Sequence, residues 1–388
     1  MKTEKPHASK TTSRMRYRSH RPFLDGLHWL LPILAGLVSL DSYSTGPIQV
    51  LKRRSTEKFE TVHSLAYSPD GKMLAIGSSA PSLRPGRFPG DQVLPEGTIE
   101  LWDLSTETLV NTFRQSAKTE NGDTFNQVGA LTFSPNGKWL IGSDVPGYTL
   151  WEVATGKQKF KWRSGIIEPL SPGWSPNGKW IALPSMVHPD AAPYDSTPHG
   201  VALVEAKTGK SKMFCAVEIG YPRAARISPD GKLLATAGHD CTVRVFDTLG
   251  MTNVFSDFTE TTMSAVGFSP DGRYLVAGSS WGGVLLIYEI QSDGGKMLIN
   301  KKGKSIPGAG EVHGVEFTLD GKRALSNSSS GVVLWDASTW SSFKLLGESY
   351  GRLSPDGSRM ALTHESSPNA IEIWALEALE PTMGAPRN

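Results

Sequence analysis

Four residues near the middle of the sequence carry groups that could perform chemistry. His188, Asp190, Asp195 and His199 lie close together in the chain. Imidazole and carboxylate groups are common ligands of metal ions. No cysteine and no regular helix fixes the spacing of these four residues, so the sequence favours a surface loop over a metal site.

Three further motifs suggest catalysis or phosphate binding. Residues 278–282 read Gly-Ser-Ser-Trp-Gly and fit the pattern of a serine nucleophile at Ser280, but that pattern needs a turn from a strand into a helix. Here it lies between two expected strands. Segments 209–211 and 303–305 read Gly-Lys-Ser and lack the earlier glycine of a phosphate loop. We therefore expect no catalytic residue, no cofactor and no metal ion.

The elements that must position any site come from one short motif written seven times. Each copy lies between two apolar segments. Proline presets φ for a type I turn, and glycine accepts positive φ at the fourth position. Each copy therefore predicts a hairpin of two antiparallel strands, here called a and b. The motif Ser-Pro-Asp/Asn-Gly begins at Ser68, Ser134, Ser175, Ser228, Ser269 and Ser354, and a degenerate Thr-Leu-Asp-Gly begins at Thr318.

A third apolar strand, called c, follows each hairpin, and a weaker fourth strand, d, follows strand c. Strands this apolar are covered on both faces, which a ring of radially stacked four-stranded sheets provides. The sequence therefore predicts an all-β fold, a seven-bladed β-propeller of four-stranded antiparallel blades. The c strands are expected at Thr98–Asp103, Tyr148–Glu152, Val201–Glu205, Thr242–Asp247, Val284–Glu289, Val332–Asp336 and Ala370–Trp374, and three d strands at Glu107–Phe113, Gln158–Trp162 and Lys296–Asn300.

The last repeat lacks a convincing outer strand. Only 14 residues follow Trp374, and they are rich in Glu and Pro. Upstream of the first repeat, residues 48–51 alternate as a strand does and have no other partner. We predict that they form the outer strand of blade seven, which closes the ring and removes an exposed edge.

These repeats resemble the WD40 family over residues 47–376. The copy at 227–247 is nearest to the family pattern, with Phe246 in place of the usual tryptophan. The Gly-His dipeptide before strand a is absent, and the turn aspartate before strand c is clear only at Asp240. The resemblance implies a non-catalytic scaffold that binds a protein partner.

The family topology also implies two faces. One carries the a–b and c–d turns, and the other carries the b–c and d–a loops. The long segments Ser79–Gly97, Arg114–Gln127, Pro184–His199 and Lys301–Val312 fall on the second face and are candidate binding loops. The aromatic and charged residues expected on this interaction face are Arg84, Arg87, Phe88, His188, Asp190, Tyr194, Asp195, His199 and Trp281.

An alternative is a propeller enzyme or a small-ligand-binding protein that acts at the central channel. Such a site needs polar residues on the innermost strands, which are mostly apolar. The exceptions are Arg223, Arg226, His313 and Glu316. One pocket holding all four would favour this alternative, and their dispersal around the ring would disfavour it.

The near-neutral charge of the chain is an average over two unlike parts. Residues 1–22 carry seven bases and one acid, whereas the remainder carries 33 bases and 37 acids. An acidic body disfavours nucleic acid as a partner. The basic tail precedes an uncharged apolar run, Trp29–Leu40, which is typical of a targeting segment.

This apolar run fits a secretory signal slightly better than a full membrane span. Cleaved signal, uncleaved anchor and a buried N-terminal helix on a cytosolic protein all stay open. A cleaved signal and an uncleaved anchor would both export the residues that follow the segment, and an anchor would also tether them to the membrane. We expect a short apolar N-terminal helix within a segment at 23–44, a propeller at 47–376 and a C-terminal tail at 377–388.

Two cysteines, Cys215 and Cys241, make no disulfide framework. We expect two buried small apolar residues, although the sequence does not decide whether they pair. The chain is expected to be a monomer.

Overall fold

The computed structural model describes residues 46–53, 61–79, 97–115, 128–144, 147–163, 170–185, 199–216, 220–293, 296–305, 310–346, 350–363 and 369–379. The basic tail and the expected N-terminal helix lie outside these residues. Within the described part of the chain, no helix is both long and apolar enough to cross a membrane.

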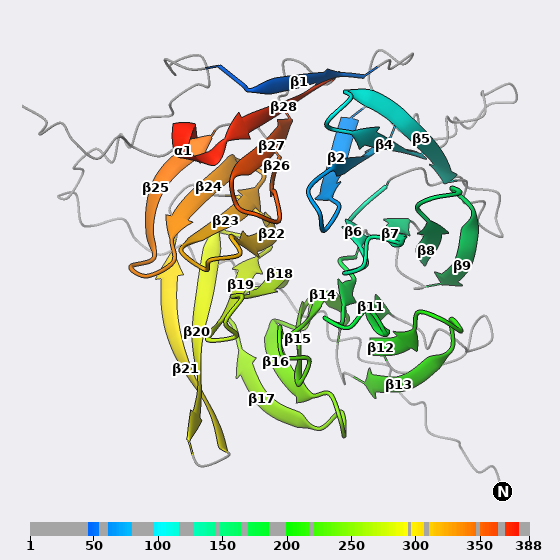
Figure 1. Cartoon of the computed structure of the whole chain (residues 1–388). Coiled ribbons are helices and arrows are strands. Elements are labelled where there is room, and N and C mark those ends of the chain that lie inside the picture. The colour runs from blue at the N-terminus through cyan, green and yellow to red at the C-terminus, as the bar shows by residue number, and fades with distance from the viewer. Residues whose placement is uncertain are drawn as a thin grey trace, which may run out of the picture. The chain divides into compact units, whose positions relative to one another are not determined.

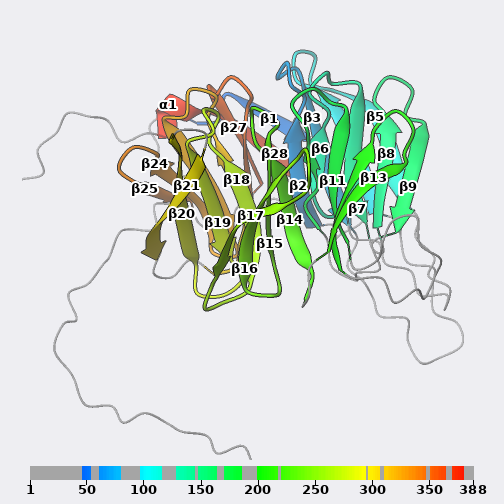
Figure 2. The ribbon, with the colours of Figure 1, turned by 90° about the horizontal axis from the view of Figure 1, so that it is seen from below.

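The described strands form seven antiparallel sheets of four strands, arranged as blades around a central axis (Figure 1). Seen from the side, the strands run between two faces of the ring (Figure 2). Blade one contains β2 (Thr61–Tyr67), β3 (Met73–Ser79), β4 (Gly97–Asp103) and β5 (Thr108–Gln115), and blade two contains β6 (Leu131–Phe133), β7 (Trp139–Asp144), β8 (Gly147–Glu152) and β9 (Gln158–Arg163). Blade three contains β10 (Gly173–Trp174), β11 (Trp180–Ser185), β12 (Gly200–Glu205) and β13 (Ser211–Ala216).

The remaining blades follow the same order from the axis outward. Blade four contains β14 (Pro222–Ile227), β15 (Leu233–Gly238), β16 (Thr242–Asp247) and β17 (Asn253–Phe258), and blade five contains β18 (Met263–Phe268), β19 (Tyr274–Ser279), β20 (Val284–Asp293) and β21 (Lys296–Ser305). Blade six contains β22 (Val312–Phe317), β23 (Arg323–Ser328), β24 (Gly331–Asp336) and β25 (Ser341–Leu346), and blade seven contains β26 (Gly351–Leu353), β27 (Arg359–Thr363), β28 (Ala370–Ala375) and β1 (Gln49–Lys52). The predicted fold class is confirmed for the propeller.

The tetrapeptide turns owe their shape to a small hydrogen-bond network. Ser68 Oγ donates to Asp70 Oδ1 at 2.6 Å and accepts from Met73 N at 2.9 Å, and Lys72 N donates to the same carboxylate oxygen at 3.1 Å. The fourth residue, Gly71, has positive φ, as predicted, and the equivalent glycines have φ between 67° and 75°. The two hydroxyl bonds recur, with asparagine as the acceptor at 136 and 177 and threonine as the donor at 318, in the turns that begin at Ser134, Ser175, Ser228, Ser269, Thr318 and Ser354.

The ring closes as the sequence predicts. β1 pairs with β28, and the register sets Gln49 opposite Ile373 and Leu51 opposite Ile371. Leu51 is buried in the cluster between blades seven and one. The amino-terminal strand therefore supplies the outer edge that the last repeat lacks.

Arg53, directly after β1, ties the closing strand to blade one. Its buried guanidinium lies 2.9 Å from Glu100 Oε2, and its Nη2 donates to Ser78 Oγ at 2.9 Å. Trp102 Nε1 donates to the same Glu100 oxygen at 2.9 Å. The segment 46–53 thus joins blade seven through its backbone and blade one through this side chain.

The predicted c strands agree with the structure to within one residue, except in blade five. There, β20 and β21 pair over ten residues each, and the hairpin extends beyond the other blades (Figure 1). The expected loop Lys301–Val312 is wrong in its first part, because residues 301–305 belong to β21. Continuous cross-strand pairing extends the strand past the last apolar residue of the sequence pattern.

Two smaller features also refine the sequence-based expectation. A short helix, α1 (Leu376–Leu379), follows β28, and Leu376 and Leu379 are buried against blades six and seven. Cys215 and Cys241 are free thiols. Cys215 is buried as expected, but Cys241 is only half-buried, because it occupies a turn position with a φ of 53°.

We predict that Arg53→Met destabilises the ring. The change leaves Glu100 largely buried without its cation, and removing one partner of a buried ion pair costs about 3–5 kcal/mol. Adding Glu100→Gln should restore part of the loss, because no unpaired charge then remains. Urea unfolding of the two single variants and the double variant measures this coupling, and strictly additive losses would contradict it.

The turn aspartates predict an acid-sensitive ring. The hydrogen bond from the turn serine lowers the pKa of Asp70, and likewise that of Asp356. A carboxylate with a lowered folded-state pKa stabilises the fold above its unfolded pKa of about 3.9. That stabilisation is lost as the pH falls through the folded-state value.

Asp70→Asn with Asp356→Asn should therefore lose less stability between pH 6 and pH 3 than the natural protein. Asparagine fits this turn, because Asn136 and Asn177 make the same serine hydrogen bond. Urea midpoints at both pH values give the comparison. An equal acid-induced loss in variant and natural protein would contradict a role for these two carboxylates.

Candidate functional site

A cavity of about 380 Å³ occupies the central channel and is lined from all seven blades. The turn motif sets which residues reach it. The residue five positions before each turn serine or threonine lies in the cavity wall in the six blades where that residue is described. These residues are His63, Gly129, Leu170, Arg223, Ser264 and His313.

Irregular pairing of the innermost strands directs four of these side chains toward the cavity. The register shifts between Val62 and Ser64 in β2 and between Pro222 and Ala224 in β14, and equivalent shifts occur in β18 and β22. A bulge leaves one residue out of the ladder and re-aims its side chain. The residues left out are His63, Arg223, Ser264 and His313.

A second register position lies two residues before each turn serine or threonine. Thr132, Arg226 and Arg352 from this position also line the cavity. Glu316 from the same position in blade six lies beside them, with its Oε1 2.7 Å from Arg352 Nη1. The four polar residues expected at the channel, Arg223, Arg226, His313 and Glu316, are therefore gathered in one cluster.

Two of the three arginines in the channel pair with glutamates. Arg223 Nη1 lies 2.6 Å from Glu311 Oε1 and donates to Ser280 Oγ at 3.0 Å. Arg352 pairs with Glu316. Arg226 instead donates to neutral oxygens, which are the carbonyls of Ser171, Pro172 and Ala225 and the Ser171 hydroxyl, at 2.8–3.3 Å.

Burial shapes the charge state of the cluster. It lowers the pKa values of His63 and His313, so both imidazoles are neutral at neutral pH. It raises the pKa of Glu316, against the opposing effect of Arg352. It lowers the pKa of Arg226 to about 10, which still leaves this group charged. Among the described residues, three arginines face two carboxylates, so this part of the channel carries a net positive charge.

The expected interaction face is described only in part. Arg84, Arg87, Phe88, His188, Asp190, Tyr194 and Asp195 lie outside the described residues. His199 Nδ1 lies 2.5 Å from Gly220 O, and its ring meets Tyr221 edge-on at 6.4 Å. His199 therefore joins blade three to blade four.

Trp281 lies in the b–c turn of blade five and is 75% exposed. We call the face with the b–c and d–a connections the loop face. Phe258 ends β17 on the same face of blade four and is 78% exposed. Ser280, beside Trp281, accepts the hydrogen bond from Arg223, so the exposed tryptophan adjoins the channel mouth.

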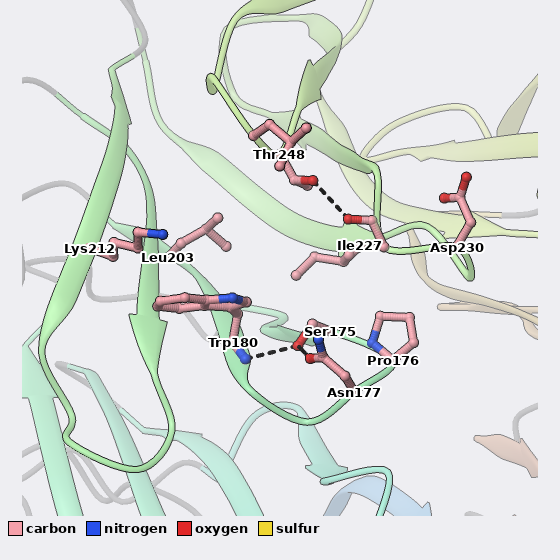
Figure 3. Close-up of a pocket in the computed structure, with 11 residues that line it drawn as sticks. Ser175, Pro176, Asn177, Trp180, Leu203, Lys212, Ile227, Asp230 and Thr248 are labelled. Carbon is pink, nitrogen blue, oxygen red and sulfur yellow. Dashed lines mark hydrogen bonds between the residues drawn. The ribbon is translucent and has the colours of Figure 1, made fainter.

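A second cavity, of about 290 Å³, lies between blades three and four on the opposite, turn face (Figure 3). Lys212 Nζ lies 4.9 Å from the centre of the Trp180 ring. Thr248 Oγ1 donates to Gly231 O at 2.7 Å, and Ser175 Oγ accepts from Trp180 N at 2.8 Å. The hydroxyls of Thr248 and Ser175 in this groove are thus already engaged in hydrogen bonds with the backbone of the neighbouring turns.

The sequence motifs missed several channel residues. Glu311, Arg352, His63 and Tyr350 all line the cavity, yet none was singled out. Counting back two and five residues from each turn serine would have found Arg352 and His63. No local signal marks Glu311 or Tyr350, because each lies directly before an innermost strand and outside the two positions counted from the turn.

The fold and its central cluster define a closed seven-bladed β-propeller with a polar channel. The family model described as WD domain, G-beta repeat, matches residues 220–247 and 253–289. These segments cover β14–β16, β17–β19 and the first part of β20, so blades four and five of the propeller match the WD40 repeat model. Such propellers are commonly protein-interaction scaffolds and are typically non-catalytic. A search of curated proteins finds no match.

The polar contacts made around strand c differ from blade to blade. In blade six, Trp335 Nε1 donates to Ser326 Oγ on the neighbouring strand at 2.9 Å. In blades one and seven, the strand-c tryptophan donates instead to a glutamate two residues earlier. In blade four, Asp240 pairs with Arg244. The blades thus hold a common fold with different polar contacts.

We predict that the charges at the channel mouth set the protonation of His313. Burial lowers its pKa, Glu311 acts to raise it and Arg223 acts to lower it. Glu311→Gln should therefore lower the pKa of His313 further, and Arg223→Gln should raise it. NMR titration of the imidazole measures both changes, and shifts of the same sign in the two variants would contradict this electrostatic account.

Proposed function

We propose that this protein is a non-catalytic WD40-type scaffold that binds a protein partner through its loop face. The observation that carries the proposal is the pair of exposed aromatic side chains, Trp281 and Phe258, on adjacent blades of that face. Tryptophan is enriched among the residues that dominate binding energy at protein interfaces. The long connections 80–96 and 186–198, expected from the sequence to contribute to binding, lie outside the described residues.

We further propose that the propeller is exported and tethered through its N-terminal segment. The support is the sequence pattern of seven bases in residues 1–22 followed by the uncharged run 29–40. N-terminal sequencing of the mature protein, with membrane fractionation, tests this. A mature chain that begins at Met1 in a soluble cytosolic fraction would overturn it.

A second candidate function is small-ligand binding at the central channel. It is favoured by the cavity that gathers Arg223, Arg226 and His313, with Glu316 beside Arg352. This candidate and the scaffold are compatible, because the loop face surrounds the channel mouth.

The scaffold proposal predicts that Trp281→Ala weakens partner capture by about tenfold or more, as expected when an interface anchor is truncated. Leu319→Ala is the matched control, because Leu319 is a comparably exposed apolar residue, 70% exposed, on the turn face. Quantitative pull-down with both variants gives the readout. A second variant combines Trp281→Ala with shortened connections 80–96 and 186–198. If this variant and Trp281→Ala both capture the same partners as the natural protein, the proposal is wrong.

A further inference from the structure

Among the described residues, the central channel gathers three arginines and two carboxylates, so one positive charge is in excess there. Arg226 is the arginine without an ion pair among these residues, since the two glutamates pair with Arg223 and Arg352, although Glu316 also acts electrostatically on Arg226. Neutral carbonyl and hydroxyl oxygens satisfy hydrogen bonds but do not compensate a charge. A net positive, partly enclosed cavity favours an anionic ligand.

The geometry of Arg226 leaves part of its guanidinium for such a ligand. Its hydrogen bonds come from Nη1 and Nη2, and within the described residues its Nε makes none. These bonds fix the guanidinium plane against the Ser171–Pro172 backbone. A guanidinium held in one orientation loses little further freedom when it binds a planar carboxylate through two hydrogen bonds.

Arg352 supplies a second cationic group to the same cavity. Its Nη1 lies 2.7 Å from Glu316 Oε1, and this contact holds the side chain in place. A guanidinium has five N–H donors, so pairing with one carboxylate oxygen leaves other N–H groups of Arg352 for a ligand.

Size and lining restrict the ligand further. About 380 Å³ is enough for a small organic molecule rather than a polymer. Val62, Leu131 and Val315 line the cavity together with the arginines, so a ligand with a short apolar part fits better than a bare inorganic ion. Phosphate carries about 1.5 to 2 negative charges at neutral pH, which exceeds the single uncompensated positive charge.

We propose that the central channel binds a small monocarboxylic acid, with its carboxylate against Arg226 and Arg352 and its apolar part against the neighbouring aliphatic side chains. This inference deepens the second candidate function above. It does not depend on the protein-binding face, because the groups involved lie on the innermost strands and the residues that lead into them.

Ser171 offers a matched pair of variants. Its hydroxyl accepts from Arg226 Nη2 at 2.8 Å and it lines the cavity. Ser171→Asp places an internal carboxylate beside Arg226, whereas Ser171→Asn adds nearly the same volume without charge. Thr132→Asp and Thr132→Asn repeat the comparison from blade two, in case the first pair does not fold.

The probe is propionate, titrated calorimetrically into the full chain at constant ionic strength, with phosphate and chloride in parallel. We expect saturable propionate binding that Ser171→Asp weakens by about tenfold or more, the loss of one charge-assisted contact, while Ser171→Asn stays within about threefold. Thermal unfolding without ligand checks that each variant is folded.

Equal propionate binding by the Asp and Asn variants, or no binding by the natural protein, would overturn the proposal. Tighter binding of phosphate than of propionate would overturn the choice of a carboxylate. Partner capture by the same variants separates the two functions. If propionate binding fails and Trp281→Ala still loses its partner, the channel inference falls and the scaffold stands.

Discussion

The hydrogen bonds inside the Ser-Pro-Asp-Gly turn are the interaction on which the rest of this structure depends. In each blade the serine hydroxyl, or the Thr318 hydroxyl in blade six, donates to the turn aspartate or asparagine and accepts from the backbone five residues later. This fixes where strand a ends and strand b begins. Because side chains alternate along a strand, it also fixes which residues face the axis and which pack between blades.

The channel follows from that register. Positions two and five residues before the turn lie toward the axis in successive blades, and their side chains are mostly small or apolar. Arginine, glutamate or histidine occupies these positions in blades one, four, six and seven, and there the ring gathers a polar cluster. Bulges in four inner strands re-aim the outer members of this cluster, including His63 and His313, toward the mouth of the channel.

Closure is the second constraint, because a row of blades would expose a strand edge and an uncovered sheet face at each end. Backbone pairing of β1 with β28 and the buried pair of Arg53 with Glu100 join the ends through one short segment. The closed ring places the exposed Trp281 and Phe258 on the same face as the mouth of the charged channel.

The sequence by itself determined the blade count, the hairpin turns and the strand that closes the ring. These features are local, because turn chemistry and apolar alternation are written within a few residues of one another. The extended β20–β21 hairpin escaped prediction, since pairing between strands sustains it where the apolar pattern stops. Only the tertiary structure decided that Arg226 makes no ion pair with a described carboxylate, that Glu311 faces Arg223 and that Arg352 joins them. These pairings connect blades far apart in the chain, and the distances between their charges depend on how the ring closes.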